Sequence, residues 1–365
     1  MIKTKTLLKT ITQQKTNRFV SVHLPWGTFH KPVKKVVKKL SNGELISLVD
    51  KIAKSDHDFL LSVAEKHKSV NAFLKDRLIN PTPDFISEDI RKWAHANSPV
   101  VFTIECLPVK SQNPLKTTNT LPDLAEIACL THFNEVGRVL KEKFNLLVKF
   151  KFLVEANIYG ELFGIPRSTS GKFFALLKRL QNEIIKGEFI ELVNWESELL
   201  SLNNFEGKLE EQKLKIKGLF QDGDEEVVRE FLTIFPTVFM SIKPEGNPED
   251  IIIKCKKISR DVLRHVEKAK EVTINIMAFN RTRKLLNERT ILFQNNLRAT
   301  LTPAKGKWAF YPIGPWNKMY PHHGVGVFNT KNNTVTVLYE RDIEQNLSND
   351  GDLLFFNNPY LIPQA

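Results

Sequence analysis

The fold is decided by residues 99–154, which read PVVFTIECLPVKSQNPLKTTNTLPDLAEIACLTHFNEVGRVLKEKFNLLVKFKFLV. Residues 100–104, VVFTI, form a short β-rich run that suits a buried strand. Pro122 is well placed as the first residue of a helix that continues to about Phe144. Residues 148–154 then alternate apolar and lysine side chains, which is typical of a strand. This order of strand, loop, helix and strand predicts a βαβ unit, in which ligand-binding loops follow the carboxyl ends of the strands.

The chain divides around this unit into four parts. Residues 1–95 combine a basic N-terminal arm with helical patterns over 43–55 and 87–96, and residues 96–194 form the α/β core with a further helix from about Thr169 to Lys186. Residues 195–290 are mainly helical, and residues 291–365 are β-rich, with short runs at 296–301, 308–311, 324–328 and 334–340. We therefore predict an α/β protein with a Rossmann-like central sheet flanked by helices, an additional mainly helical region and late C-terminal strands. The late strands either complete the first sheet or form their own.

Composition restricts the class of protein. A chain of 365 residues with 42% hydrophobic content can bury a substantial core. Its apolar runs are shorter than the roughly 20 residues that span a bilayer, and its first residues lack a signal-peptide pattern, so we expect a cytoplasmic protein without a membrane partner. Cys106, Cys129 and Cys255 are too scattered for a disulfide framework or a structural zinc site. Reduced thiols and no metal are expected.

The formal charge of +12 raises the question of nucleic-acid binding. The 53 basic residues are interleaved with 41 acidic ones, and the dense basic segment is confined to residues 34–39. We therefore expect no nucleic-acid partner, and a positive field that steers small anionic substrates instead. A basic nucleic-acid-binding protein remains the alternative, which salt-dependent binding to nonspecific DNA or RNA would reveal.

The loop Pro108–Thr117, PVKSQNPLKT, is the first candidate site. It lies between a strand and a helix, where backbone N–H groups and a helix N-terminus favour anions. Lys110 and Lys116 could hold a phosphate, with Ser111 and Asn113 as further ligand-binding donors. The alternative is an ordinary solvated loop, and the glycine framework of a P-loop is absent.

Two carboxylates extend the apolar stripe of the following helix. Asp123 and Glu126 are spaced with Leu130 and Phe133 by three or four residues, so Glu126 is predicted to be partly buried. Burial would raise the pKa of Glu126 and a lysine partner would lower it, and either state could serve proton transfer. Alternatively, both carboxylates only cap the helix and balance its dipole.

The segment Tyr320–Val327, YPHHGVGV, contains adjacent histidines before a β run. His322 and His323 are candidate general acids or bases because imidazole titrates near neutrality. Neighbours in a strand point to opposite faces, so one of them is expected to reach the site. No HxH or HxxxH spacing accompanies them, which makes a metal the less favoured use. Arg298 suits bidentate binding of a substrate carboxylate, with a surface salt bridge as the alternative.

These segments resemble one known family. PVKSQNPLKTTNTLPDLAE (108–126) looks like the P-x-K-S-x-N-P-x-K and PD-x-x-E segments of the isocyanide (isonitrile) synthases, the pyoverdine/dityrosine-biosynthesis proteins. NLRATLTP (296–303), PIGPW (312–316) and PHHGVGVF (321–328) resemble the family's R-x-S-I-H-P and PWHGV-type segments. The resemblance covers roughly residues 99–180 and 296–341, and its first motif is the more specific.

The resemblance implies an isonitrile synthase that converts the α-amine of an L-amino acid, usually tyrosine or tryptophan. Ribulose 5-phosphate would be the carbon donor and co-substrate, without a metal or organic cofactor. It further implies Glu126, His322 and His323 as proton-moving groups, and Lys110, Ser111, Asn113, Lys116, Asp123 and Arg298 as substrate-binding residues. The C-terminal strands would complete the catalytic unit, and a downstream oxygenase would be a pathway partner.

The chain departs from the family pattern at two places. Thr302 stands where the family usually has a histidine, and Glu155-Ala156-Asn157 stands where many members have Ser-Asp-Gly. A hydroxyl cannot replace an imidazole as a base near neutral pH. These departures imply either a different amino-acid substrate or an altered step. Three alternatives follow: an N-formyl or other amino-acid product, lost activity, and a noncatalytic binder of phosphate ligands.

Overall fold

The computed structural model describes residues 40–79, 90, 98–117, 120–154, 157–254, 259–286, 296–301, 308–317, 319–343 and 353–355. Within these residues, a parallel sheet has the strand order β3-β2-β1-β4-β5. The strands are β1 (Val100–Cys106), β2 (Val148–Val154), β3 (Ile190–Asn194), β4 (Leu297–Thr300) and β5 (Trp308–Ala309). This order matches most of the doubly wound arrangement of Rossmann folds. The predicted α/β class and Rossmann-like sheet are confirmed.

The predicted βαβ unit forms the centre of this sheet. β1 pairs with β2 in parallel, with Val100 opposite Val148, and α4 (Leu124–Phe144) connects them. The helix packs through Phe133, whose ring centroid lies 5.0 Å from that of Phe150 and 5.1 Å from that of Phe152. The alternation of β2 therefore reflects a strand whose phenylalanines face a covering helix.

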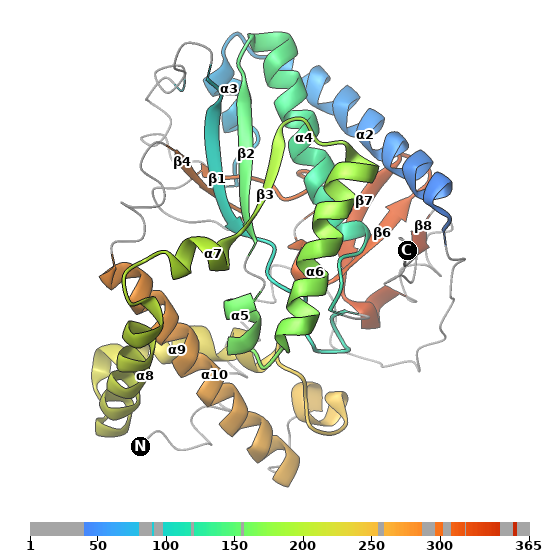
Figure 1. Ribbon diagram of the computed structural model, residues 1–365. Coiled ribbons are helices and arrows are strands. Elements are labelled where there is room, and N and C mark those ends of the chain that lie inside the picture. Colours follow the sequence, from blue (N-terminus) through green and yellow to red (C-terminus); the bar gives the residue numbers. More distant parts are fainter. Residues whose placement is uncertain are drawn as a thin grey trace.

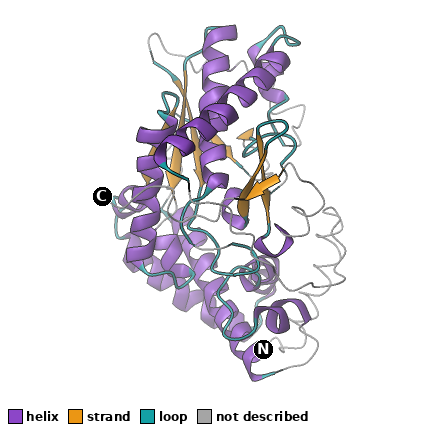
Figure 2. Ribbon diagram, turned by 90° about the vertical axis from the view of Figure 1, so that its right-hand side faces the viewer, coloured by secondary structure: helices purple, strands orange, loops and turns teal. Residues whose placement is uncertain are grey.

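The C-terminal strands were expected either to complete the first sheet or to form their own, and they do both. β4 and β5 extend the first sheet beyond β1. β6 (Val325–Asn329) pairs antiparallel with β7 (Thr334–Leu338) and β8 (Leu353–Phe355) in a second sheet. Figure 2 shows the two sheets as separate groups of strands. β3 was not predicted, because its burial depends on pairing with β2, which lies far away in sequence.

Two large hydrophobic cores among the described residues contact the first sheet. One contains Phe102 and Phe150 together with residues of α2 (Asn42–Ala64) and α4. The other contains Leu153 and the helical region. Successive residues of a strand face opposite sides, so β2 contributes to both cores. Figure 1 shows α2 and α4 at the upper right and the helices of the second core at the lower left.

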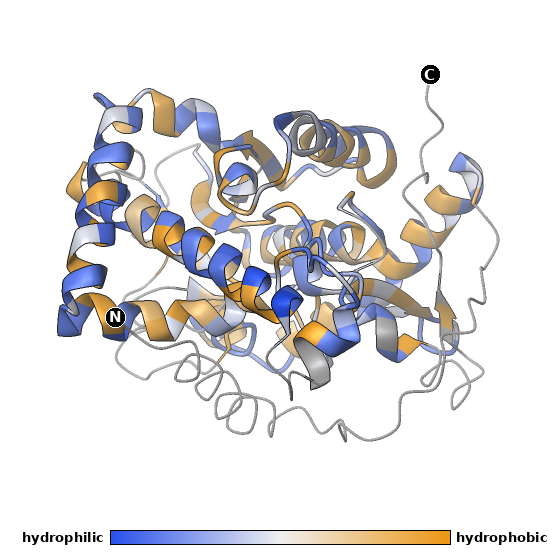
Figure 3. Ribbon diagram, turned by 90° about the horizontal axis from the view of Figure 1, so that it is seen from below, coloured by the Kyte–Doolittle hydropathy of each residue, from blue (hydrophilic) through white to orange (hydrophobic). Residues whose placement is uncertain are grey.

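The predicted helical region is confirmed within the described residues. Its elements are α7 (Trp195–Leu200), α8 (Phe205–Asp222), α9 (Glu225–Phe239), η4 (Glu249–Lys254) and α10 (Arg260–Leu285). α9 buries Val227, Phe231, Phe235 and Phe239 at helical spacing against this core. Figure 3 shows the corresponding mixture of hydrophobic and hydrophilic residues along the helices. None of the described helices combines the length and the hydropathy that crossing a membrane requires.

The remaining helical elements are short, apart from α6. They are α3 (Val70–Lys75), α5 (Asn157–Leu162), α6 (Arg167–Arg179), η3 (Leu180–Ile185), η5 (Pro321–His323) and η6 (Glu340–Asp342). The helix predicted from about Thr169 to Lys186 corresponds to α6 followed by η3, which has π-helical geometry. The basic arm, most of the pattern at 87–96, Cys255, Thr302 and Glu155-Ala156 lie outside the described residues.

Candidate functional site

The loop after β1 lies where the strand order reverses. The chain runs from β1 to β2 and β3 on one side, and β4 and β5 lie on the other side of β1. In open α/β sheets, ligands bind beyond the carboxyl ends of the strands at this point. Leu107 begins the loop with a left-handed φ of 55°, which for a non-glycine residue costs about 1–3 kcal/mol. The predicted anion-binding loop therefore starts in a strained conformation at the expected place.

Lys110 is enclosed by protein. Its exposed fraction is 0%, and Nζ donates to Asp123 Oδ2 at 2.8 Å, to the Gly324 carbonyl at 2.7 Å and to the Pro321 carbonyl at 3.2 Å. Glu126 Oε2 lies 3.1 Å from the same nitrogen. An ammonium has three N–H donors, so protein acceptors already use them. Lys110 thus ties the loop to α4 and to the segment before β6.

Asp123 and Glu126 cap the helix and also contact the lysine loop, which are the two roles that the sequence allowed. Asp123 caps α4: Oδ1 accepts from Ala125 N at 2.8 Å, and the Asp123 N–H donates to Glu126 Oε2 at 2.9 Å. Asp123 Oδ1 also accepts from Gly326 N at 3.2 Å. A Cβ on Gly326 would lie 2.4 Å from Ala125 N, so only glycine permits this approach of β6 to the helix. Helix capping and contact with the lysine loop are therefore one arrangement.

The carboxyl group of Glu126 titrates near neutral pH in this cluster. Burial raises the pKa of Glu126 to about 7, and Lys110 only partly opposes the rise. For Lys110, burial acts to lower the pKa, but Asp123 and Glu126 together outweigh it and raise the pKa. Lys110 therefore remains charged while Glu126 exchanges its proton near pH 7. The predicted burial of Glu126 is confirmed, since its exposed fraction is 0%.

Ser111, Asn113 and Lys116 fasten the loop to the end of α9. Ser111 Oγ donates to the Ser241 carbonyl at 2.7 Å, and Asn113 Nδ2 donates to the Met240 carbonyl at 2.8 Å. Lys116 Nζ donates to Ser241 Oγ at 3.1 Å, and the exposed fraction of Lys116 is 7%. The alternative of a solvated loop is therefore wrong. The hydrogen bonds of Ser111 and Asn113 hold the loop in place. Ligand binding by these residues stays a prediction.

The histidine pair joins the loop, but not as predicted. His322 and His323 belong to the 3₁₀ turn η5, and their ring centroids lie 4.1 Å apart. The prediction of opposite faces was wrong, because it assumed strand geometry that begins only at Val325. The His322 carbonyl accepts from Ser111 N at 3.4 Å. Two imidazoles, rather than one, are thus placed beside the loop.

Both imidazoles are neutral at physiological pH. Burial, reinforced by Lys116 and Lys110, lowers the pKa of His322 to about 3. Burial and the neighbouring His322 lower the pKa of His323 well below its usual range. As whole residues, both histidines are partly exposed, but the positive charges of Lys116 and Lys110 also lower both pKa values. Nδ1 of each ring has no hydrogen-bond partner among the described residues. A neutral imidazole with an unused nitrogen can accept or donate a proton.

Arg298 lies in a different ion-pair group. On β4 its Nε donates to Glu105 Oε1 at 2.9 Å, and Arg283 approaches Glu105 Oε2 at 3.1 Å. The Arg283 guanidinium lies 4.0 Å from the ring centroid of Trp195. The salt bridge that the sequence offered as an alternative is therefore present, although it is partly buried rather than on the surface. Binding of a substrate carboxylate by Arg298 stays a prediction.

Sequence reasoning missed three participants: Glu105, Ser241 and Gly326. Glycine within a strand pattern often marks a close backbone approach, which could have identified Gly326. Ser241 follows a helix and carries no local signal. Among the described residues, no group of three or more His, Cys, Asp or Glu side chains is arranged to hold a metal ion.

The fold defines the class as an α/β protein, with a buried polar cluster at the switch point of its parallel sheet. The profile of the pyoverdine/dityrosine biosynthesis proteins matches residues 90–234. The crystal structure of the PvcA protein from Pseudomonas aeruginosa is similar at a TM-score of 0.53 and 15% identity, covering 82% of this chain and 94% of that chain. No curated protein matches the sequence.

Residues 90–234 of the chain are thus similar in sequence to the pyoverdine/dityrosine biosynthesis proteins. The matched residues include the loop with Lys110 and Lys116, together with Asp123 and Glu126. The histidine pair lies beyond the matched segment, and the fold brings it to that loop. The similarity to this family therefore covers the part of the chain that forms the centre of the candidate site.

Proposed function

We propose that the protein is an isonitrile synthase that acts on the α-amine of an L-amino acid, with ribulose 5-phosphate as the carbon donor. The aromatic amino acids tyrosine and tryptophan are the first substrates to test. The observation that carries the proposal is the pair of neutral imidazoles next to two buried lysines, in a chain similar to this family. That combination supplies proton transfer and anion attraction at one place.

The proposed reaction needs three kinds of group. The substrate amine joins the C2 ketone of the sugar as an imine, and water leaves. Phosphate is then eliminated, and the C1–C2 and C2–C3 bonds break so that C2 remains as the isonitrile carbon. C1 leaves as formaldehyde and C3–C5 leave as hydroxyacetone, so the reaction balances without an oxidant. An anion site must hold the phosphate, and other groups must move protons on and off carbon and oxygen. Lys116 is the better phosphate ligand of the two lysines, because the donors of Lys110 are used by protein acceptors.

The histidines are the proposed proton carriers. Burial and the nearby lysines keep both rings neutral, which leaves a nitrogen free to accept a proton. A bound phosphate would offset the lysine charges and raise the pKa values of the rings toward the working pH, where a general base is most effective. Glu126 is fully buried, so we assign it a positioning role through Lys110 rather than contact with the substrate. Its replacement should therefore alter the pH profile of turnover and the stability, whereas replacement of the histidines should abolish turnover.

The experiment incubates the purified protein with each amino acid and ribulose 5-phosphate, and detects the isonitrile by mass and by infrared absorption. His322→Gln and His323→Gln test the proton carriers, and Lys116→Met tests the phosphate site. Lys141→Met is the control, because Lys141 is exposed and pairs with Glu188 on the surface. Lys116→Met should raise KM for the sugar phosphate much more than KM for the amino acid.

Other outcomes of this assay would favour a different function. An N-formyl amino acid in the mass spectrum would indicate that carbon transfer occurs without the final elimination. Binding of ribulose 5-phosphate without consumption of any amino acid would contradict synthase activity and favour a noncatalytic phosphate binder. Equal turnover by wild type and the His322→Gln/His323→Gln double variant would refute the assignment of proton transfer to this pair.

A further inference from the structure

A hollow of about 280 Å³ opens between α2, α4 and η3. Thr131 and Glu135 of α4 line it. Successive residues of an α-helix are about 100° apart, so Thr131 and Glu135 lie about 140° and 180° around the helix axis from Glu126. The nine residues from Glu126 to Glu135 span about 14 Å along the axis. The hollow is therefore separate from the candidate functional site, although one helix contributes to both.

The floor of the hollow contains polar atoms without hydrogen-bond partners. Thr131 and Glu135 are each 1% exposed. Thr131 Oγ1, Glu135 Oε2 and His57 Nδ1 lack a hydrogen-bond partner among the described residues. Glu135 Oε2 lies 3.2 Å from His57 Nδ1 and 3.1 Å from Arg138 Nη1, close enough for charge attraction but without hydrogen-bond alignment. Because buried polar groups are nearly always paired, this concentration of them indicates a polar occupant.

The charges around the hollow are balanced. Asp50 and Glu135 supply two negative charges, and Lys54 and Arg138 supply two positive ones. Asp50, Lys54 and Arg138 are exposed at the rim. Burial raises the pKa of Glu135 despite Arg138 and His57 nearby, so its carboxylate would gain from a further cation. An occupant with an ammonium at the floor and an anionic group at the rim matches this arrangement.

The wall of the hollow includes a rare backbone conformation. Ile185 is the last residue of η3, which has π-helical geometry. Such turns are uncommon and occur frequently at functional sites. Together with Val49 and Ala53, Ile185 gives the hollow an apolar side. A ligand with a hydrocarbon part beside its charges would contact it.

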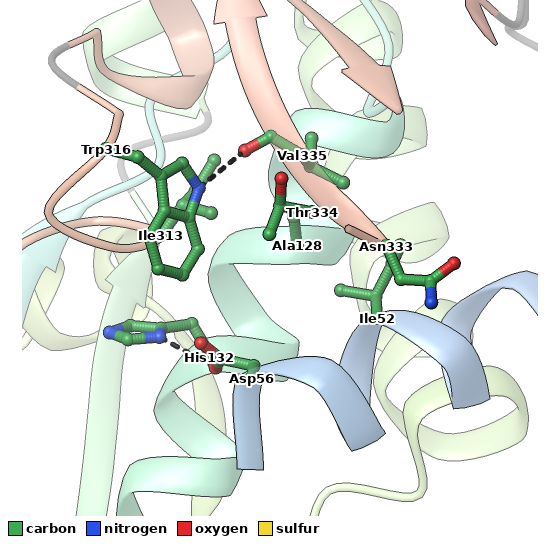
Figure 4. Close-up of a pocket in the computed structure, with 9 residues that line it drawn as sticks. All are labelled: Ile52, Asp56, Ala128, His132, Ile313, Trp316, Asn333, Thr334 and Val335. Atoms are coloured by element: carbon green, nitrogen blue, oxygen red, sulfur yellow. Dashed lines mark hydrogen bonds and ion pairs between the residues drawn. The ribbon is translucent and has the colours of Figure 1, made fainter. Parts of the chain in front are cut away.

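A second, smaller cavity lies between α2 and α4, and its buried polar side chains form a hydrogen-bonded pair. His132 Nδ1 and Asp56 Oδ2 lie 2.8 Å apart, and Figure 4 shows this pair enclosed near Trp316 with Ile52, Ala128 and Ile313 in the lining. The cavity has only about 10 Å³, room for roughly one water molecule. Asp56 Oδ1 also lacks a partner there, but no ligand fits. The larger hollow differs in size and in its charged rim.

We propose that the hollow between α2, α4 and η3 binds a free α-amino acid. The ammonium contacts Glu135 and Thr131, and the carboxylate contacts Arg138 and Lys54 at the rim. The side chain lies against Val49, Ala53 and Ile185. This site is additional to the proposed active site and does not depend on isonitrile formation.

The test measures binding of the proteinogenic L-amino acids to the full chain by calorimetry and saturation-transfer NMR. Thr131→Val and Glu135→Gln should each weaken the bound amino acid by about tenfold or more, the effect of losing a buried hydrogen bond to a charged group. Because Thr131 Oγ1 has no partner in the free protein, Thr131→Val should keep or raise Tm. It therefore tests binding even if Glu135→Gln fails to fold.

Two controls separate this site from the proposed active site. Arg298→Met changes the residue predicted to bind the substrate carboxylate at the active site, and it should leave the binding at the hollow unchanged. Thr273→Val should also leave it unchanged, although it removes a buried hydroxyl that donates to Ala269 O at 2.6 Å. The amine without the carboxylate and the acid without the amine should each bind about tenfold weaker or worse. The proposal is overturned if no amino acid binds, if Thr131→Val leaves binding intact, or if Arg298→Met removes all of it.

Discussion

Lys110→Met removes a buried cation, so the buried carboxylates of Asp123 and Glu126 lose their ion-pair partner. Nζ of Lys110 lies 2.8 Å from Asp123 Oδ2 and 3.1 Å from Glu126 Oε2, and the side chains are 1%, 6% and 0% exposed. Methionine keeps most of the apolar volume, so the loss is mainly electrostatic. Breaking a buried ion pair from one side costs about 3–5 kcal/mol of unfolding free energy, and we expect a loss of this size near neutral pH.

The loss should depend on pH with a definite sign. Without Lys110, nothing cationic in this contact opposes the burial that raises the pKa of Glu126. A carboxyl whose pKa is higher in the folded than in the unfolded state contributes stability below the unfolded pKa of about 4.3 and loses it as pH rises. The deficit of Lys110→Met should therefore be small near pH 5 and largest at about pH 8.

Urea denaturation at both pH values measures this deficit. Lys141→Met is the matched control, because Lys141 is 48% exposed and its partner Glu188 is 65% exposed. A surface pair of this kind contributes about 1 kcal/mol or less. If Lys110→Met costs as little as Lys141→Met and does so equally at both pH values, the description of Lys110 as a buried electrostatic clamp is refuted.

Three further predictions concern the same site. Glu126→Gln should remove the decline in stability between about pH 4.3 and 7, since burial raises the pKa of Glu126 to about 7; an unchanged slope in a pH series of unfolding free energies would contradict this. NMR should find His322 and His323 neutral down to pH 5, because burial lowers their pKa values, and titration near pH 6.5 would show otherwise. Gly326→Ala places a Cβ 2.4 Å from Ala125 N and should cost about 1–3 kcal/mol in thermal denaturation; an unchanged Tm would refute the close approach.

Local pattern was sufficient for the βαβ unit. The alternation of apolar residues and lysines depends on neighbours in sequence, and it predicted the bounds of β2. The helix was predicted to begin at Pro122, but α4 begins at Leu124, because the Asp123 side chain caps it. β3 was missed because its burial depends on pairing with β2. Parallel pairing is a long-range property that a five-residue segment does not display.

The composition of the site could be predicted, but its internal partners could not. Lys110 was expected to face a phosphate, yet its carbonyl acceptors are 211 and 214 residues away in sequence. His322 and His323 were identified as residues, but a 3₁₀ turn changed their relative direction. Ser241 became important only because α9 ends beside the loop. Such contacts depend on tertiary packing, which residue type and spacing do not determine.

The distance in sequence between Lys110 and Gly324 has a consequence during protein synthesis. The Gly324 carbonyl is made 214 residues after the lysine that it accepts from, which at 5–20 residues per second takes about 10–40 s. Until then β1, α4 and β2 can form, but the lysine lacks two of its acceptors and Asp123 lacks the Gly326 N–H. A nascent chain that stops before Pro321 therefore carries an incompletely paired charge cluster, and chaperone binding should be strongest during this interval.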